Sequence, residues 1–227
     1  RIDKKTAKAR LKKKEPEAEP RPEASDAPAL EPAKIKGAKK APLPAFVEPA
    51  LATLAVTPPA GDKWLHEIKF DGYRIQARIE AGRVKLLTRS GLEWTGKFGK
   101  QLVRELAALP VGLALIDGEI VVENDSGASD FSALQADLSE GRSDRFTFYC
   151  FDLLHLDGYD LQAVPLIERK KLLESLVPQA GSIRYSGHFL EDGDLVLNHA
   201  CRLSLEGIVS KLANAPYRSG RGKSWIK

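Results

Sequence analysis

The 227-residue sequence contains no methionine and only two cysteines. Cys150 and Cys201 both lie in apolar runs, which indicates buried, reduced thiols rather than the disulfide framework of a small secreted domain. No apolar run is long enough to span a membrane, and no signal peptide precedes the first charges. The four histidines are scattered without the spacing of a metal site. We therefore expect a soluble cytoplasmic protein and, because the sequence begins at Arg1 without any methionine, a fragment of a longer chain.

The first 44 residues lack aromatic side chains but contain seven prolines. Residues 1–45 hold 13 Lys or Arg against 7 Asp or Glu, whereas residues 46–227 hold 22 against 24, so the net charge of +4 belongs to the N-terminal arm. The arm has too little apolar surface to offset the entropy lost on ordering. We predict a disordered, charged, Pro-rich linker over residues 1–44, which either is a solvated tether or contacts nucleic acid through its lysines. A folded domain should follow over residues 45–227.

In residues 64–74 (WLHEIKFDGYR), a lysine lies where an apolar run meets a glycine turn. A hairpin end would explain any one of these residues. Glu67 and Lys69, however, share one face of a strand, and Asp71 and Arg74 follow closely enough to converge on the same pocket. A lysine attacks an electrophile near neutral pH only when burial or cationic neighbours lower its pKa. The pattern Glu-x-Lys-x-Asp-Gly-x-Arg therefore indicates a nucleophilic lysine.

The segments that follow predict a sheet covered by helices. Residues 75–88 alternate apolar and polar side chains around a glycine turn, as a hairpin does. The hairpin leads to Arg89, which is either a surface residue or a ligand contact. Asp130 can cap a short helix. Apolar residues at helical spacing predict helices over residues 98–106, 131–138, 167–177 and 192–203.

Two further predicted strands carry informative side chains. Residues 113–122 are apolar except around Asp117 and Glu119, and an acid in such a strand is costly unless it is paired or solvated. Glu119 therefore either faces a polar cleft or forms a buried ion pair with an arginine. Residues 146–154, which include Phe151, are almost entirely apolar and aromatic, as in a strand that is buried on both faces.

Two basic motifs come last. Residues 206–211 (EGIVSK) form a predicted strand with Glu206 at one end and Lys211 at the other. Residues 217–227 (YRSGRGKSWIK) place a basic glycine loop before a closing strand that ends at Lys227. Such a loop either wraps phosphates through backbone N–H groups and cations or remains solvated.

Taken in order, these motifs resemble the set found in the adenylation domain of ATP-dependent DNA ligases. The resemblance covers about residues 45–227, and six motifs in the right order make chance a poor explanation. The residues around 46–49 and 64–67 are most similar to the ligase module of bacterial ligase D, which acts in non-homologous end joining. The matching segments are 64–74, 89–91, 117–119, 149–152, 206–211 and 225–227.

The resemblance implies an α+β nucleotidyltransferase domain, ATP-grasp-like, with antiparallel sheets flanked by helices and ATP in the groove between them. The OB-fold domain that follows in the family is absent from this sequence, so nick sealing by this fragment alone is not expected. Lys69 would attack the α-phosphate of ATP, form a covalent enzyme-AMP and release pyrophosphate. The AMP would then pass to a DNA 5′-phosphate for nick sealing in double-strand break repair.

Individual roles also follow from the resemblance. Glu67 would receive the adenine amino group, while Phe151 would stack on the adenine and Ile208 or Val209 would cover its other face. The expected nucleotide contacts are Glu67, Ile68, Arg74, Arg89, Glu119, Phe151, Val209, Lys211 and Lys227. The expected catalytic residues are Lys69, Asp71, Lys211 and Lys227, with the last two on the α-phosphate. Mg²⁺ or Mn²⁺ would be held by Glu206, Glu119 and Asp71.

The expected partners are nicked or broken double-stranded DNA, an OB-fold domain, and the phosphoesterase and polymerase modules of a longer chain, in the bacterial cytoplasm or nucleoid. Two alternatives remain open. One is an RNA ligase or a GTP-using capping enzyme, which shares the lysine motif and differs in nucleotide preference. The other is a catalytically inert nucleic-acid-binding module, against which the complete set of charged motif residues argues.

Overall fold

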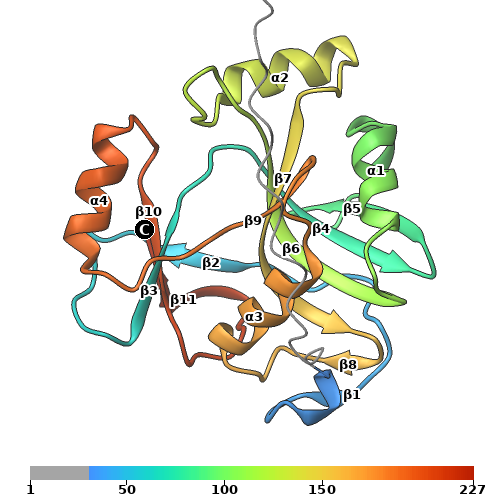
Figure 1. Ribbon diagram of the computed structural model, residues 1–227, viewed down its shortest axis with the longest axis horizontal. Coiled ribbons are helices and arrows are strands. Elements are labelled where there is room, and N and C mark those ends of the chain that lie inside the picture. Colours follow the sequence, from blue (N-terminus) through green and yellow to red (C-terminus); the bar gives the residue numbers. More distant parts are fainter. Residues whose placement is uncertain (1–30) are drawn as a thin grey trace, which may run out of the picture.

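The computed structural model describes residues 31–227, so residues 1–30 of the linker predicted for residues 1–44 lie outside the described part of the chain. Two β-sheets pack against each other, and helices cover their outer surfaces (Figure 1). Among the described residues, no helix has the length and apolar character needed to cross a membrane.

The larger sheet has seven strands in the order β1-β8-β7-β6-β4-β5, with β9 beside β7. Its neighbours run antiparallel, except that β9 is parallel to β7. The predicted hairpin is confirmed, because Ala81 and Gly82 take the left-handed φ values of 48° and 75° that suit a two-residue turn. The strands are β1 (Lys39–Lys40), β4 (Tyr73–Glu80), β5 (Arg83–Thr88), β6 (Leu113–Val122), β7 (Phe146–Leu156), β8 (Tyr159–Asp160) and β9 (Ile183–Tyr185).

The smaller sheet has four strands in the order β2-β11-β10-β3. Here β2 and β11 are parallel, so each sheet contains one parallel pair that the sequence did not indicate. The basic glycine loop expected before the closing strand is already part of β11 from Gly220 onward, because its backbone pairs with β2. The strands are β2 (Ala50–Thr53), β3 (Trp64–Ile68), β10 (Ile208–Leu212) and β11 (Gly220–Ile226).

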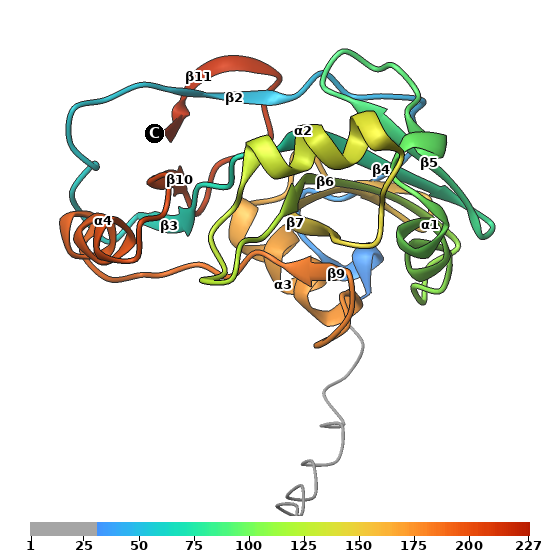
Figure 2. The same cartoon turned by 90° about the horizontal axis from the view of Figure 1, so that it is seen from above.

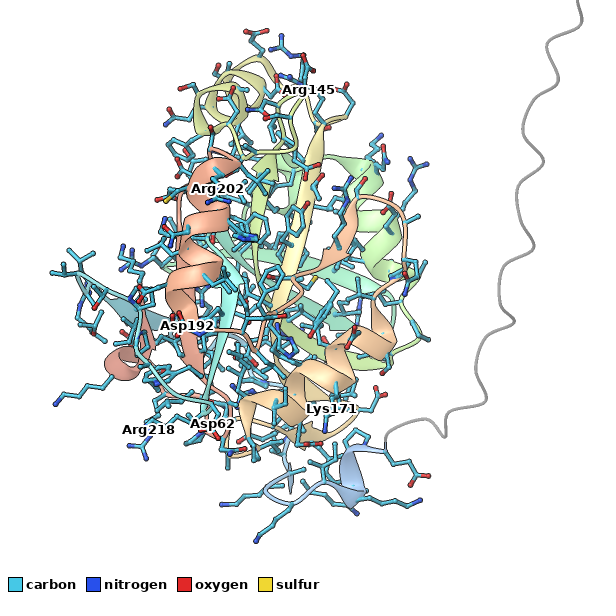
Figure 3. All side chains as sticks on the ribbon, turned by 60° about the vertical axis from the view of Figure 1, so that its left-hand side comes forward. Asp62, Arg145, Lys171, Asp192, Arg202 and Arg218 are labelled. Carbon is cyan, nitrogen blue, oxygen red and sulfur yellow. The ribbon has the colours of Figure 1, made fainter. Side chains whose placement is uncertain are left out.

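The four predicted helices are confirmed with small changes at their ends. Asp130 caps α2 by accepting a hydrogen bond from the Ala133 N–H at 2.9 Å, as expected. Asp192, labelled in Figure 3 together with Arg202, caps α4 in the same way. Figure 2 shows α4 beside β3 and β10, at the opposite end of the molecule from α1. The helices are α1 (Lys100–Ala107), α2 (Phe131–Glu140), α3 (Leu166–Leu176) and α4 (Gly193–Arg202), with short 3₁₀ turns at Pro32–Lys34 and Thr95–Lys97.

Residues 31–44 lie on the larger sheet, although we expected them to belong to the disordered linker. Strand β1 pairs with β8, and Ile35 and Ala38 pack against the main core. The carbonyl of Ala41 lies 3.0 Å from Nε2 of the buried His155. This segment can order without aromatic side chains because the edge of the sheet offers unpaired backbone groups to a short strand.

The two cysteines differ in burial. Cys150 is buried in β7, as predicted, whereas Cys201 is exposed on α4, so that prediction was wrong. The side chains of α4 that pack on the smaller sheet are Val196 and Ala200, which are four residues apart. Cys201 lies one residue beyond this face and is therefore turned toward solvent.

Three apolar clusters hold the layers together. The largest lies between the larger sheet and helices α1 and α3, and a small one joins α4 to the smaller sheet. The remaining cluster lies between the two sheets. It contains Phe151 of β7 and Trp225 of β11, with Val209 of β10 packed against it. This cluster therefore joins strands that are far apart in the sequence and forms the floor of the space between the sheets.

A buried ion pair fixes α3 to β7. The Arg169 guanidinium donates hydrogen bonds to both carboxylate oxygens of Asp152 at 2.7 and 2.9 Å, and both side chains are almost fully buried. Arg169 also donates to the carbonyl of Val164 at 2.5 Å. Removal of either charge would lower the stability of the fold, because it leaves the other charge unpaired in an apolar environment.

We predict that Arg169→Met lowers the free energy of unfolding by about 3–5 kcal/mol, since it leaves the Asp152 carboxylate buried without its partner. Urea unfolding followed by circular dichroism measures the change. The control is Lys171→Met on the exposed side of α3, which removes only a surface pair with Glu168 and should cost about 0.5 kcal/mol. Equal losses in the two variants would contradict the prediction.

Candidate active site

Lys69 is the first residue beyond the end of β3. The pairing of β3 with β10 ends at Ile68 and Ile208, and the Lys69 N–H then donates to the carbonyl of Gly207 at 3.0 Å. Its ammonium group forms an ion pair with Glu206, and its side chain is 23% exposed. Lys69 is thus fixed through its backbone while its amine remains accessible.

The turn after Lys69 depends on a glycine. A Cβ atom added to Gly72 would lie 2.1 Å from the carbonyl oxygen of Ile120 on β6, so only glycine allows this close approach of the two backbones. The Asp71 N–H donates to the Ser129 hydroxyl at 3.0 Å. Phe70 stacks on Tyr149 of β7, with ring centroids 4.0 Å apart. The turn is therefore held against the larger sheet on both sides of Asp71.

A pocket of about 280 Å³ lies between the two sheets, next to Lys69. Ten of the twelve predicted catalytic, nucleotide-binding or metal-binding residues line it, and Asp71 and Glu206 are the two that do not. Those ten residues are Glu67, Ile68, Lys69, Arg74, Arg89, Glu119, Phe151, Val209, Lys211 and Lys227. The structure therefore brings together motifs that are spread over about 160 residues of sequence.

Phe151 reaches this pocket because β7 contains a bulge. The register pairs Asp117 of β6 with Asp152 but the next residue, Gly118, with Cys150, so Phe151 is an extra residue without a partner on β6. A bulge of this kind redirects a side chain relative to the regular alternation of a strand. Of the two residues expected to oppose Phe151, Val209 lines the pocket, whereas Ile208 packs beneath α4 on the other face of the smaller sheet.

Arg74 is held in place by a carboxylate that was not assigned a role. It donates to both oxygens of the fully buried Asp117 at 2.7 Å, and its guanidinium lies 4.5 Å from the centre of the Phe151 ring. Tyr217 donates to the same carboxylate at 2.7 Å and accepts a hydrogen bond from the Ala50 N–H. The buried ion pair considered for Glu119 thus exists with Asp117 as the acid.

Glu119 faces the pocket, as predicted by one of the two alternatives. Burial raises the pKa of its carboxyl group, and the negative charges of Asp117 and Asp71 raise it further. The positive charges of Arg74 and Lys69 oppose this shift, and the resulting pKa is about 7. Near neutral pH the carboxyl group is therefore close to the balance between its two protonation states.

Glu67 lies at the inner end of the pocket between two lysines. Its Oε2 accepts a hydrogen bond from Lys211 at 2.7 Å, and its Oε1 lies 2.9 Å from the Lys170 ammonium. Burial raises the pKa of Glu67, but the two lysines lower it more strongly, so the pKa falls below its ordinary value. Burial together with the charge of Lys170 lowers the pKa of Lys211 to about 8.

The position of Lys211 differs from the expected one. Its ammonium lies 4.5 Å from the Phe151 ring centre and 4.2 Å from that of Trp225, so it occupies the aromatic end of the pocket and is turned toward Glu67. Lys227 and Arg89 also line the pocket, and both are exposed. These two side chains are therefore open to an anionic ligand, whereas Lys211 is engaged with a carboxylate.

Several residues at the site had no role predicted from the sequence. Asp117 and Trp225 were inside predicted motifs, and Tyr217 and Arg221 were inside the basic glycine segment 217–227, so a signal existed for these four. Lys170 carried no such signal, because it comes from α3 and reaches the site only through the fold. The unassigned residues that contact or line the pocket include Asp117, Lys170, Tyr217, Arg221 and Trp225.

The acids around Lys69 fit a divalent cation only if that ion takes most of its ligands from elsewhere. Within residues 31–227, no group of three or more His, Cys, Asp or Glu side chains is arranged as a metal site. Burial, together with the charges of Asp117 and Asp71, raises the pKa of Glu119, and a nearby cation would oppose this shift. Mg²⁺ commonly uses one or two carboxylates and completes its shell with phosphate and water. The residues present fit that mode of binding.

Comparison with known proteins gives a consistent result. Residues 49–227 match the family model described as ATP dependent DNA ligase domain. The chain is 41% identical over 203 residues to the multifunctional non-homologous end joining protein LigD of Pseudomonas aeruginosa. The aligned region covers 88% of this chain and 24% of that protein. It is also 34% identical over 184 residues to the SPbeta prophage-derived DNA ligase-like protein LigB of Bacillus subtilis. That aligned region covers 80% of this chain and 67% of that protein.

The fold is also shared with a solved structure. Mycobacterial DNA ligase D complexed with ATP and MES aligns with a TM-score of 0.69 and 34% sequence identity, over 79% of this chain and 58% of that chain. The predicted α+β fold and the predicted resemblance to ATP-dependent DNA ligases are therefore confirmed. The chain spans only about a quarter of the length of the Pseudomonas protein.

We predict that Glu119→Gln stabilises the domain at high pH. The folded-state pKa of about 7 lies above the ordinary 4.5, so the folded protein retains a proton that the unfolded chain has released. Stability should therefore fall as the pH rises from about 4.5 to about 7. At about pH 8 the variant should be more stable than the wild type by about 2 kcal/mol, a value reduced because Glu119 is partly exposed to the pocket.

Urea unfolding at about pH 5 and about pH 8 tests this prediction. At the lower pH the two proteins should have similar stabilities, because Glu119 is then largely protonated in the folded state. The control is Glu48→Gln, which replaces an exposed carboxylate and so removes the same formal charge. A stability difference between Glu119→Gln and the wild type that is the same at both pH values would contradict the assignment.

Proposed function

The chain belongs to the ATP-dependent DNA ligase family, and from this premise we propose that residues 45–227 are an adenylation domain in which Lys69 attacks ATP. The observation that carries the proposal is the convergence of ten predicted site residues on one pocket beside the accessible amine of Lys69. The products of this first reaction are a covalent enzyme-AMP and free pyrophosphate.

In this reaction the neutral amine of Lys69 forms a bond to the α-phosphorus of ATP, and the bond from that phosphorus to the bridging oxygen of pyrophosphate breaks. Pyrophosphate leaves with the electron pair of the broken bond. The amine gives up a proton to water, and the Glu206 carboxylate, which contacts Lys69, would help to hold the amine in position. The anchored backbone of Lys69 supports this role, because nucleotidyl transfer depends mainly on positioning and on stabilisation of charge.

The adenine would occupy the inner part of the pocket, with Phe151 on one face and Val209 on the other. Glu67 would accept a hydrogen bond from the adenine amino group. Because the ammonium of Lys211 lies over the Phe151 ring, a stacked adenine would displace it. The long, flexible lysine stem would let this ammonium swing outward to the α-phosphate, which is the position expected from the sequence.

The phosphates would lie at the open side of the pocket, near Lys227 and Arg89. Glu119 and Glu206 would hold a divalent cation, Mg²⁺ or Mn²⁺, with Asp71 close by. The bound cation would supply stabilisation of the negative charge that develops on the phosphate oxygens. Arg74 would act mainly as a wall of the ribose site, because Asp117 already binds the Nε–Nη2 edge of its guanidinium.

The later steps involve parts of a longer protein. The Pseudomonas relative is described as a multifunctional non-homologous end joining protein. By analogy, AMP would pass from Lys69 to the 5′-phosphate at a DNA nick, and a 3′-hydroxyl would then displace it during the repair of broken DNA in the bacterial cytoplasm or nucleoid. An OB-fold domain and phosphoesterase or polymerase modules would be the covalent neighbours.

We predict that the purified domain gains the mass of one AMP, about 329 Da, when it is incubated with ATP and Mg²⁺. Excess pyrophosphate should remove this mass, because the formation of a phosphoramidate from ATP is reversible. Lys69→Ala should abolish the gain, since no amine remains at that position. Intact-protein mass spectrometry of both proteins, before and after each incubation, is the measurement.

Lys63→Ala provides a matched control, because Lys63 is an exposed lysine six residues before Lys69 and does not line the pocket. It should be labelled like the wild type. Labelling of Lys69→Ala at the wild-type level would disprove the assignment of the nucleophile. Labelling by GTP but not by ATP would favour the alternative of a capping enzyme.

A further inference from the structure

Lys170 is a buried lysine that has no role in the proposed reaction as described above. It lies on α3, its side chain is 0% exposed, and its Nζ donates to the Ser186 carbonyl at 2.8 Å. The same Nζ is 2.9 Å from Oε1 of Glu67 and 4.7 Å from the Tyr185 ring centre. Burying a lysine is costly unless a negative charge is nearby, so Lys170 and Glu67 stabilise each other.

The two lysines that flank Glu67 are not equivalent. Lys170 approaches from behind the site and does not line the pocket, whereas Lys211 does line it and lies over the aromatic rings. A base stacked on Phe151 would take the space of the Lys211 ammonium. Of these two lysines, Lys170 would then be the one still in contact with Glu67 while the nucleotide is bound.

Glu67 also has an open acceptor position. Its Oε2 receives hydrogen bonds from Lys211 and, at 3.3 Å, from the Ser186 hydroxyl. Within residues 31–227, no group donates a well-aligned hydrogen bond to its buried Oε1, although Lys170 is close enough for an ion-pair contact. A buried acceptor without a hydrogen bond is costly, and a donor brought in by a ligand would remove this cost.

An ionised carboxylate accepts hydrogen bonds but cannot donate one. It therefore favours a purine with an amino group at position 6, as in adenine, and disfavours one with an oxygen there, as in hypoxanthine or guanine. A protonated carboxyl group could donate to that oxygen and would discriminate less. The charge state and the position of Glu67 thus decide which purine the pocket prefers.

We propose that Lys170 is the positioning residue that holds Glu67 as a charged acceptor and thereby makes the domain select 6-amino purine nucleotides. This inference rests on the proposed function, because it requires that Lys69 is labelled by a nucleotide. Lys170 acts through Glu67 and contacts neither the base nor the reacting atoms.

The test compares initial rates of Lys69 labelling by ATP and by inosine triphosphate, which has an oxygen at position 6. The ratio of kcat/KM for ATP to that for inosine triphosphate should fall about tenfold in Lys170→Met. A tenfold change is the effect expected if the loss of Lys170 raises the pKa of Glu67 by about one unit. The loss for ATP should appear mainly in KM, because Lys170 is remote from the reacting phosphorus. Lys170→Arg keeps the charge and should restore most of the selectivity.

The matched control is Lys171→Met, on the outer face of the same helix, where Figure 3 labels Lys171. It should keep the wild-type ratio. If Lys170→Met does not fold by circular dichroism, Lys170→Gln serves instead, because its amide can still donate to the Ser186 carbonyl while lacking the charge. An unchanged ratio in a folded, neutral Lys170 variant would overturn the inference but leave the proposed function standing. Failure of the wild type to be labelled by either nucleotide would overturn both.

Discussion

The ion pairs of Glu67 are the interaction on which the arrangement of the site depends. This one buried carboxylate lies on β3, two residues before Lys69, and it binds Lys211 on β10 and Lys170 on α3. It therefore joins the smaller sheet to the helix that covers the larger one. A buried charge with two partners on different elements fixes their relative positions, because separating any of them leaves an unpaired charge in an apolar environment. Because Lys69 follows Glu67 by two residues, these ion pairs also fix the position of the nucleophile.

A second network, on the opposite wall, gives the pocket its shape. Asp117 binds Arg74 and Tyr217, and the bulge in β7 turns Phe151 toward the same space. Both features are buried, so a change in either one would break buried hydrogen bonds at a cost in free energy. The walls of the pocket are thus fixed at its inner end, where an adenine would have to displace the Lys211 ammonium, while Arg89 and Lys227 remain exposed at its mouth. This division suits a ligand with a flat apolar base and a charged phosphate tail.

Much of this arrangement could be predicted from the sequence. The positions of the four helices and of the longer strands followed from the apolar pattern, and the order of the motifs identified ten residues that do line one pocket. Other features depend on distances across the fold that no local pattern encodes. The bulge at Phe151 exists only in the register between β6 and β7, and Lys170 looks like any lysine of an amphipathic helix. Likewise, nothing in the sequence showed that Arg74 would pair with Asp117 rather than Glu119.

The most direct test of the account is a crystal structure of the domain after incubation with ATP and Mg²⁺. We expect a covalent bond between Nζ of Lys69 and the phosphorus of AMP, with the adenine between Phe151 and Val209 and its amino group within hydrogen-bonding distance of Glu67. Lys170 should still contact Glu67 after Lys211 has moved away. An unmodified Lys69, or a nucleotide bound outside this pocket, would contradict it.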